Sequence, residues 1–397
     1  MTAESRFDPS APLPGPPEPW AHAPTPSRRD GPPYHMTDMI AAEPAVARRI
    51  IARVAGSADG AALAAAVRAA VVAGTPIVVT GCGTSETAAM GIVEILREAL
   101  SAGGSPGAML RSEQAFELAL DPPAGGLVIG ITHEGGTGAT NAALRAARDA
   151  GAGAAVVTVS RRSPAGGIAD IVVETGELDQ SWCHTIGYVS PMLAATAVGA
   201  AVSGHDLDAD RVAALLAAGA RDEAGAERIA SRLATATHLL VIASGVDRAA
   251  GRELTLKVEE ASWIPSAYRD VETILHGHLP ATGPDTGLIL LLADRERRAE
   301  RLARATQALA AARVVGIRTA AIIASALDSA LPEELTPAGR LIVGDDPLLP
   351  APVAAVLGTA TPLQLLTERL ARARGTNPDQ IRRDDPIYRS AAEAAGG

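Results

Sequence analysis

The sequence predicts an α/β protein made of two successive units, each a mostly parallel sheet with helices on both faces in a flavodoxin-like, three-layer arrangement. Short runs of Val, Ile and Leu alternate with stretches of helical length, and the alternation begins again after about residue 225. Such short apolar runs separated by helices are typical of parallel strands that are covered on both faces. Two of the runs end in loops rich in glycine and hydroxyl residues, which suit an anionic ligand at the carboxyl ends of the strands.

Composition limits the classes of function. The 397 residues are 47% hydrophobic but only 2% aromatic, so Ala, Val, Leu and Ile must pack the cores. A net charge of −10 argues against nucleic acid or an anionic membrane as the partner. Cys82 and Cys183 are too few for a disulfide framework or a metal cluster, so we expect no metal or other cofactor and a cytoplasmic location. The charge-free run 186–204 contains Pro191 and is interpreted as a buried helix rather than a membrane span.

The first 34 residues are rich in Pro, Ser and Gly and are predicted to form a disordered tail. The first folded unit is assigned to residues 35–210. Its predicted elements are a helix at 36–55, a strand at 76–79, a helix at 86–100, a strand at 127–131, a helix at 139–150, and strands at 154–159 and 170–173.

Residues 204–225 are polar and rich in Ala, and are predicted to be a linker. The second folded unit is assigned to residues 225–397, including a C-terminal tail. Its predicted elements are a strand at 239–243, a helix ending near 260, a strand at 288–292, a helix at 299–312, strands at 314–317 and 341–343, and a helix at 352–374.

Two loops of the first unit have the composition of a phosphate cradle. Glycine lets the backbone approach a ligand, Ser and Thr add hydroxyl donors, and a helix N-terminus supplies free N–H groups and a favourable dipole. Two such loops on consecutive strand–helix units suggest one anionic ligand between them. The first loop consists of Cys82, Gly83, Thr84 and Ser85, and the second contains Thr132, His133, Glu134, Gly135 and Thr137.

A second set of candidate residues lies in the second unit. Lys257 and Glu260 are three positions apart and share one face of the predicted helix, whereas Glu259 lies off that face. A solvated ion pair would give the same pattern. His276 follows in the sequence Leu-His-Gly-His at 275–278. Together these residues offer a cation, a carboxylate base and a titratable imidazole, which is what enolisation beside a carbonyl requires.

Taken together, these motifs resemble the sugar isomerase (SIS) family, and within it the isomerase domain of glucosamine-6-phosphate synthase, which consists of two tandem SIS units. The likeness covers roughly residues 36–397. The matching segments are the loop 82–85, the loop 132–137, the helix residues Lys257, Glu260, Ser262, Trp263 and Ile264, the pair His276-Gly277, the run 362–366, and Gly375-Thr376, Asp379-Gln380 and Arg382.

The resemblance implies catalytic roles for residues of the second unit. Glu260 would move a proton between C1 and C2 of a sugar phosphate, and Lys257 would tune Glu260 or polarise an oxygen. His276 would assist ring opening from a neighbouring subunit, so a homodimer with shared active sites is expected. The family synthase also has a catalytic Lys in its C-terminal tail, and residues 384–389 contain none. No glutaminase domain precedes residue 36, so complete glutamine-dependent synthesis is not expected.

The cradle departs from the family pattern. The resemblance implies that Ser85, Thr132 and Thr137 hold the phosphate, but His133 replaces a Gln and Glu134 replaces a Ser. A carboxylate beside a phosphate dianion costs free energy unless it turns away or is paired. Either Glu134 points outward to bind an amine, a metal or the partner subunit, or the ligand is not a plain sugar 6-phosphate.

A third segment, 179–188, occupies the position of a Ser-Thr-Lys segment in the family and places His184 and Thr185 near the expected ligand. A capped and packed helix start would explain the same residues. The interpretation favoured by all motifs is a phosphosugar-processing enzyme, of the aldose–ketose isomerase or deaminase type, acting on an amino-sugar phosphate. The alternatives are an N-acetylhexosamine-phosphate dehydratase and a non-catalytic sugar-phosphate sensor.

Overall fold

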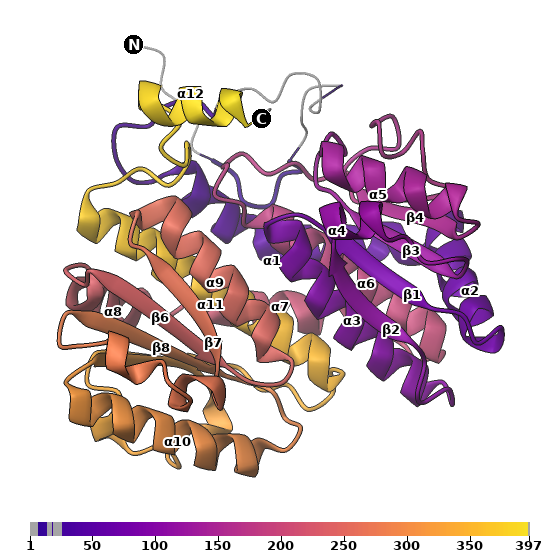
Figure 1. Ribbon diagram of the computed structural model, residues 1–397. Coiled ribbons are helices and arrows are strands. Elements are labelled where there is room, and N and C mark those ends of the chain that lie inside the picture. The colour runs from indigo at the N-terminus through magenta and orange to yellow at the C-terminus, as the bar shows by residue number, and fades with distance from the viewer. Residues whose placement is uncertain (1–6, 14–17, 19–25, 396–397) are drawn as a thin grey trace.

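Two α/β units lie side by side in the structure, a computed structural model that describes residues 7–13, 18 and 26–395 (Figure 1). Each unit contains a five-stranded parallel sheet flanked by helices. The predicted fold class, with two parallel sheets in tandem, is confirmed.

The first sheet has its carboxyl-end loops where the sequence places the cradle. Its strands are β1 (Ile77–Gly81), β2 (Leu110–Gln114), β3 (Leu127–Ile131), β4 (Gly153–Thr158) and β5 (Ile171–Glu174). They are arranged in the order β2-β1-β3-β4-β5. β1 and β3 are buried along their whole length, which is why both are unbroken apolar runs. Because Ile77 lies beside Leu127 in this parallel pair, the loops that leave the two strands are neighbours.

The helices of the first unit include one that is apolar on all sides. They are α1 (His35–Ala55), α2 (Ala58–Val72), α3 (Thr84–Ala102), α4 (Ala115–Leu120), α5 (Gly138–Asp149) and α6 (Ile186–Ser203). By length and composition α6 could cross a membrane, as could the bent pair α1 and α2 together, but 83% of α6 is buried inside the protein. It packs against α1, α2 and α3, which confirms the predicted buried helix.

The second unit repeats the architecture with the strand order β10-β9-β8-β6-β7. Its strands are β6 (His238–Ala243), β7 (Ser266–Asp270), β8 (Thr286–Leu292), β9 (Arg318–Ala324) and β10 (Gly339–Val343). Its helices are α7 (Ala209–Gly219), α8 (Glu223–Leu233), α9 (Asp247–Ser262), α10 (Arg298–Val315), α11 (Ala351–Arg374) and α12 (Pro386–Ala394). Single 3₁₀ turns occur at Thr273–Leu275, Leu279–Ala281, Ser325–Leu327 and Glu333–Leu335.

Several elements differ from the sequence prediction. The segment 204–225 is not a bare linker, because it contains α7, which packs against α1 and α11. The strand predicted at 314–317 is wrong: Val314 and Val315 end α10, and β9 begins at Arg318. The edge strands β2 and β7 were not predicted because their sequences are polar and their residues are mostly half-exposed.

In the described part of the N-terminal segment, residues 7–13 contact the first unit, and Pro26 and Arg29 accept hydrogen bonds from the C-terminal tail. Leu13 is buried, its N–H donates to Glu177 at 2.9 Å, and its carbonyl accepts from the N–H of Leu178 at 2.8 Å. Arg49 pairs with the same carboxylate at 2.6 Å. The remainder of the predicted tail, residues 1–6, 14–17 and 19–25, lies outside the described residues.

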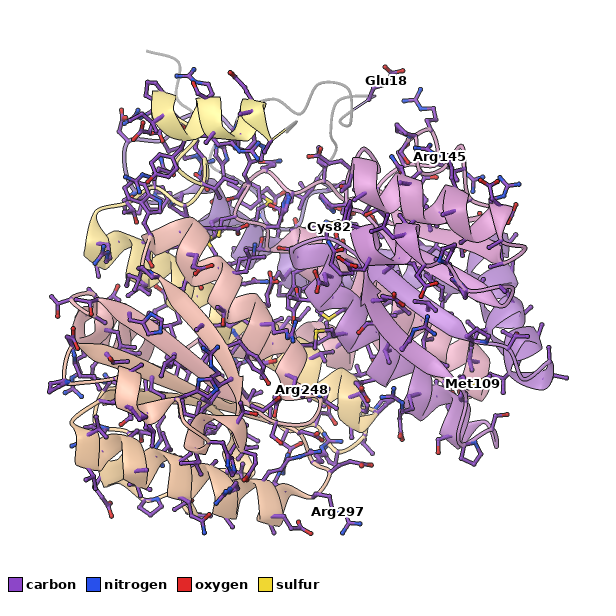
Figure 2. The ribbon with its side chains drawn as sticks, in the orientation of Figure 1. Glu18, Cys82, Met109, Arg145, Arg248 and Arg297 are labelled. Carbon is purple, nitrogen blue, oxygen red and sulfur yellow. The ribbon has the colours of Figure 1, made fainter. Side chains whose placement is uncertain are left out.

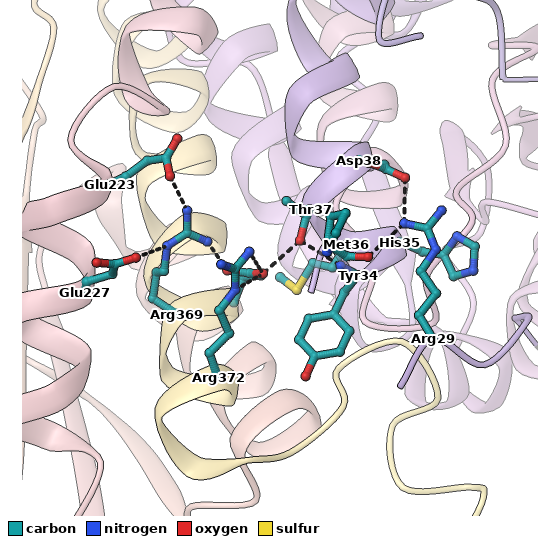
Figure 3. Close-up of polar contacts among 12 residues, drawn as sticks. Arg29, Tyr34, His35, Met36, Thr37, Asp38, Glu223, Glu227, Arg369 and Arg372 are labelled. Carbon is teal, nitrogen blue, oxygen red and sulfur yellow. Dashed lines mark hydrogen bonds and ion pairs between the residues drawn. The ribbon is translucent and has the colours of Figure 1, made fainter. Parts of the chain in front are cut away.

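Buried polar contacts fix the two units against one another. Glu368 of α11 is fully buried and accepts hydrogen bonds from Thr37 of α1 at 2.8 Å and from Arg372 at 2.6 Å. It also pairs with Arg369, which reaches Glu223 at the start of α8 (Figure 3). Because a buried charge must be paired, these contacts tie α1 of the first unit to two helices of the second.

Candidate active site

The first cradle loop turns from β1 into α3 with the backbone open to a ligand. Gly83, the residue before α3, has φ 56°, a conformation that a side chain would disfavour. None of the described side chains caps this helix, and the N–H groups of Ser85 and Glu86 donate to the carbonyls of Cys82 and Gly83 at 3.1 and 2.9 Å. Cys82 lies where the first unit adjoins the second (Figure 2). Burial raises the pKa of its thiol, which argues against a thiolate nucleophile.

The second cradle loop places two hydroxyl groups together at the end of β3. Thr132 donates to Thr137 across 3.3 Å, and Thr137 is the residue immediately before α5. The N–H of Val159 donates to the carbonyl of His133 at 2.9 Å, which holds the loop against the next strand. Gly135 has φ 80°, and a Cβ there would collide with Ser163. The loop is therefore held in one conformation, with its hydroxyls beside the first cradle.

A buried charge cluster occupies the carboxyl-terminal half of α9. Lys257 is fully buried, and its Nζ lies 2.6 Å from Glu260 and 3.5 Å from Glu253. Burial alone would lower the pKa of Lys257, but the two carboxylates outweigh it and raise the pKa above its usual value. Burial raises the pKa of Glu253 in spite of Lys257. The side chain of Glu260 remains 21% exposed, so it is the member of the cluster that a ligand could reach.

The charge cluster touches the first cradle directly. Thr84 and Thr87, in the first turn of α3, donate to the carboxylate of Glu253 at 3.3 and 2.5 Å. Sequence analysis missed Glu253, although it shares a helix face with Lys257 and Glu260 at positions i, i+4 and i+7. The tertiary structure thus brings the predicted cradle and the predicted base together.

The third predicted segment surrounds a buried carboxylate. Asp179 accepts hydrogen bonds from the N–H groups of Ser181, Thr185 and Gly187 at 3.0, 2.7 and 3.0 Å. Burial alone would raise the pKa of Asp179, but His184 and these N–H groups outweigh it and lower the pKa to about 2. Thr185, a predicted binding residue, is buried and uses its backbone to hold this carboxylate in place.

Two histidines and Glu134 adjoin Asp179. His133 accepts the N–H of Asp179 at its Nε2, at 2.9 Å, and burial together with His184 lowers its pKa to about 3. The neutral ring of His133 lies 5.4 Å from that of His184. Glu134 is half-buried; burial raises its pKa, and the charge of His184 opposes this rise. The residues that depart from the family pattern therefore form one electrostatic group.

His276 lies away from this group within a single chain. Its side chain is 67% exposed and pairs with Glu272 at 2.6 Å, beyond the carboxyl end of β7. At that end, Asp270 pairs with Arg248 in the first turn of α9. Residue 260 lies 12 positions further along α9, about 18 Å away at 1.5 Å per residue.

At the equivalent loop of the second unit, side chains of the protein bond to the N-terminus of α9, beside a cavity of about 440 Å³ that Gly245, Val246, Asp294 and Arg301 help to line. Asp294 accepts the N–H of Val246 at the start of α9, at 3.0 Å, and pairs with Arg301. Asp247 in turn accepts the N–H groups of Ala293 and Asp294 at 2.7 and 2.9 Å. A carboxylate of the chain thus occupies the position that an anionic ligand would take at this helix N-terminus.

The C-terminal tail borders the candidate site. The carbonyl of Asp379 accepts the N–H of Trp182 at 2.9 Å. The guanidinium of Arg382 stacks between Trp263 and Tyr388, at 4.4 and 3.9 Å from the ring centroids. The tail therefore runs between the loop that carries His184 and the end of α9. Sequence analysis had no signal for this stacking, because the rings come from separate elements.

A cavity and a search for metal ligands concern parts of the described structure outside the candidate site. A cavity of about 590 Å³ between α3, α6, α7 and α11 is lined by none of the predicted site residues. Among residues 7–13, 18 and 26–395, no three His, Cys, Asp or Glu side chains are grouped as a metal ion would require.

A protein-family model matches most of the second unit. The family model of the SIS domain matches residues 232–366. Residues 232–366 form an SIS domain. No curated protein matches the chain. The chain is similar in structure to the C-terminal domain of glucosamine-fructose-6-phosphate aminotransferase from Francisella tularensis, with a TM-score of 0.73, 18% identity, and coverage of 89% of this chain and 100% of that one.

Two further solved structures share the fold of this chain. Tagatose-6-phosphate ketose/aldose isomerase from Escherichia coli has a TM-score of 0.68 and 16% identity, with coverage of 89% of this chain and 96% of that one. Glucosamine-6-phosphate deaminase from Thermotoga maritima has a TM-score of 0.57 and 16% identity, with coverage of 77% and 88%. At these identities the likeness concerns the fold, which is that of two tandem SIS domains.

Proposed function

We propose that the protein is a phosphosugar-processing enzyme of the isomerase or deaminase type that acts on an amino-sugar phosphate. The observation that carries the proposal is the buried Lys257, paired with Glu253 and Glu260 and bonded through Glu253 to the first cradle loop. A fully buried ammonium group is costly and is uncommon outside functional sites. Solved structures of the same fold include proteins named as a ketose/aldose isomerase and a deaminase, which supports this reaction class.

In this proposal Glu260 is the base. Its carboxylate is partly exposed and is held at 2.6 Å by Lys257, so it has a fixed position from which to take a proton from C1 or C2 of an open-chain sugar. Lys257 would balance the charge that develops on the substrate. A positioned general base of this kind contributes about 10²–10⁴-fold to the rate.

In this proposal the first unit binds the phosphate group of the substrate. The hydroxyls of Ser85, Thr132 and Thr137 and the N-termini of α3 and α5 would hold the anion, since two adjacent helix ends offer several N–H donors. Within the same proposal the protein is a homodimer. The exposed His276 would then enter the cleft of the partner subunit and assist ring opening.

The test is incubation of the purified protein with hexosamine and N-acetylhexosamine phosphates in deuterated water, with products identified by NMR. Deuterium at C1 or C2, with or without loss of the amine, is expected. An unsaturated product would instead indicate a dehydratase, and tight binding without any turnover would indicate a sensor.

Glu260→Gln should abolish turnover while changing ligand affinity by less than about tenfold, because the amide keeps the size of the side chain but cannot take a proton. Glu259→Gln is the matched control. Glu259 is exposed and bonds to the N–H of Ser266. If Glu260→Gln kept more than about a tenth of the wild-type rate, the base would have to be another residue.

A further inference from the structure

His184 is held by a carboxylate that the fold keeps ionised and immobile. Its Nδ1 lies 3.6 Å from Asp179, an ion-pair distance rather than a hydrogen bond. The Asp179 carboxylate is fully buried and is fixed by the three N–H groups described above. Because Nδ1 faces Asp179, Nε2 points to the opposite side of the ring, and 27% of the His184 side chain is exposed. A carboxylate behind Nδ1 is the arrangement that orients an imidazole for proton transfer at Nε2.

The loop that carries His184 is fixed against the end of α9 that carries Glu260. Cys183 and Ala261, the residues next to these two in the sequence, lie in one buried apolar cluster. Thr376 donates to the carbonyl of Ala261 at 2.6 Å, three residues before the tail accepts the N–H of Trp182. His184 and Glu260 therefore belong to the same site within one chain.

The charged groups around His184 come from its own loop and from two other elements. Asp179 lies on its own loop, Glu134 on the second cradle loop, and Lys257 and Glu260 on α9. His133 is neutral and adds no positive charge. Burial and Lys257 lower the pKa of His184, but Asp179 outweighs them and raises it. Asp179 therefore shifts His184 toward the imidazolium form relative to an ordinary histidine.

We propose that His184, oriented by Asp179, is the catalytic acid that protonates the substrate oxygen while Glu260 removes the carbon-bound proton. The inference rests on the proposed function and adds a residue of the same chain to it. His276 is not needed for this step, since it is exposed and paired with Glu272. Asp179 is a positioning residue, because it acts through His184.

The step balances without another reagent. Glu260 takes the proton from C2, the C–H electron pair forms the C1=C2 bond, and the carbonyl π electrons move to O1. The Nε2–H bond of His184 breaks and its proton goes to O1, which gives an enolamine (a C1 hydroxyl and a C2 amino group on the C1=C2 bond), a neutral imidazole and a neutral carboxylic acid. In the second half, the imidazole takes a proton from the amino group at C2 as C2=N forms, and Glu260 returns its proton to C1, which gives the imine of the ketose. Both side chains end as they began.

The first test measures His184 without substrate. Histidine-labelled protein is titrated by NMR, and the His184 signal is assigned with His184→Gln. We expect a pKa above 6.5 in the wild type and a fall of at least about one unit in Asp179→Asn, because the orienting charge is lost. The exposed His205 is the internal reference, and its NMR signal should be the same in the wild type and in Asp179→Asn. A His184 pKa below 6.5, or one that Asp179→Asn leaves unchanged, overturns the inference.

The second test measures turnover with the sugar phosphate that the deuterium experiment identifies. We expect His184→Gln to lower kcat by about 10²-fold or more and to remove the alkaline limb of the kcat/KM profile, while His205→Gln keeps the wild-type profile. Added imidazole should restore part of the activity of His184→Ala, which a purely structural role would not allow. This variant also keeps Asp179, so it covers the case in which Asp179→Asn does not fold.

The outcomes separate the two proposals. Deuterium incorporation that survives His184→Gln, with the alkaline limb in place and no effect of imidazole on His184→Ala, overturns the role of His184 and leaves the proposed function standing. Absence of incorporation in the wild-type protein overturns both.

Discussion

Glu43 is a fully buried carboxyl group at the contact between the two α/β units, and its protonation should make stability depend on pH. It lies on α1, and its Oε2 accepts a hydrogen bond from Thr361 of α11 at 2.6 Å. Its other oxygen is buried without a hydrogen-bond partner among the described residues. Burial raises the pKa of Glu43 from 4.5 to about 8, against the opposing effect of Thr361 and Gln364. The folded protein therefore keeps the neutral acid at pH values where the unfolded chain is ionised.

The size of the effect follows from the two pKa values of Glu43. A raised folded-state pKa means that folding takes up a proton between pH 4.5 and about 8. The contribution of Glu43 to the free energy of unfolding is complete below pH 4.5 and is lost as the pH rises through this window. The loss between pH 5 and pH 8 is roughly 3–4 kcal/mol, at about 1.4 kcal/mol for each pKa unit.

Glu43→Gln should remove this dependence, since the amide keeps an acceptor for Thr361 but cannot ionise. Urea unfolding at pH 5, 6, 7 and 8 would show the wild type losing stability relative to Glu43→Gln as the pH rises. Glu300→Gln, on the exposed face of α10, is the control and should follow the wild-type curve. Wild-type and Glu43→Gln curves that stay parallel over this range would refute the reasoning.

Three further predictions concern the candidate site. Lys257→Met should destabilise the protein by about 3–5 kcal/mol in urea unfolding, because Glu253 loses its buried partner. The double variant Lys257→Met/Glu253→Gln should recover part of the stability but no turnover. A Lys257→Met variant as stable as the wild type would contradict this. Glu134→Ser should weaken substrate binding or slow turnover by at least about tenfold, about 1.4 kcal/mol, because the carboxylate recognises the substrate or acts as an acid. Calorimetry measures the affinity and steady-state kinetics the rate. Tighter binding would show instead that the charge of Glu134 repels the ligand. Mixed subunits of His276→Ala and Glu260→Gln should regain part of the wild-type activity, whereas an exchanged but inactive mixture, or a monomer in sedimentation, would count against shared sites.

The elements that could be predicted are those whose signal lies in neighbouring residues. β3 was predicted at its observed bounds because a strand covered on both faces is an unbroken apolar run. β2 and β7 were missed because an edge strand is half-exposed and tolerates polar side chains, such as those of Arg111, Glu113 and Arg269. The linker prediction failed for a similar reason, since an Ala-rich helix such as α7 has few residues that mark it as apolar.

Some contacts of the candidate site could be predicted from the sequence, and others could not. The pairing of Lys257 with Glu260 was readable from the period of the helix, because residues three apart share a face. The hydrogen bonds from Thr87 to Glu253 and from Asp179 to His133 join residues far apart in the sequence, so no local sequence pattern predicts them.

Amino-acid order was thus enough for the apolar central strands such as β1, β3, β6 and β8, several of the main helices and the residue types of the cradle loops, because these depend on residues a few positions apart. The burial of Lys257, the neutral state of His133 and the ion pair of His184 followed from packing alone. Desolvation and the charges brought by other elements set the protonation of a side chain, and neither exists until the two sheets and their helices have come together.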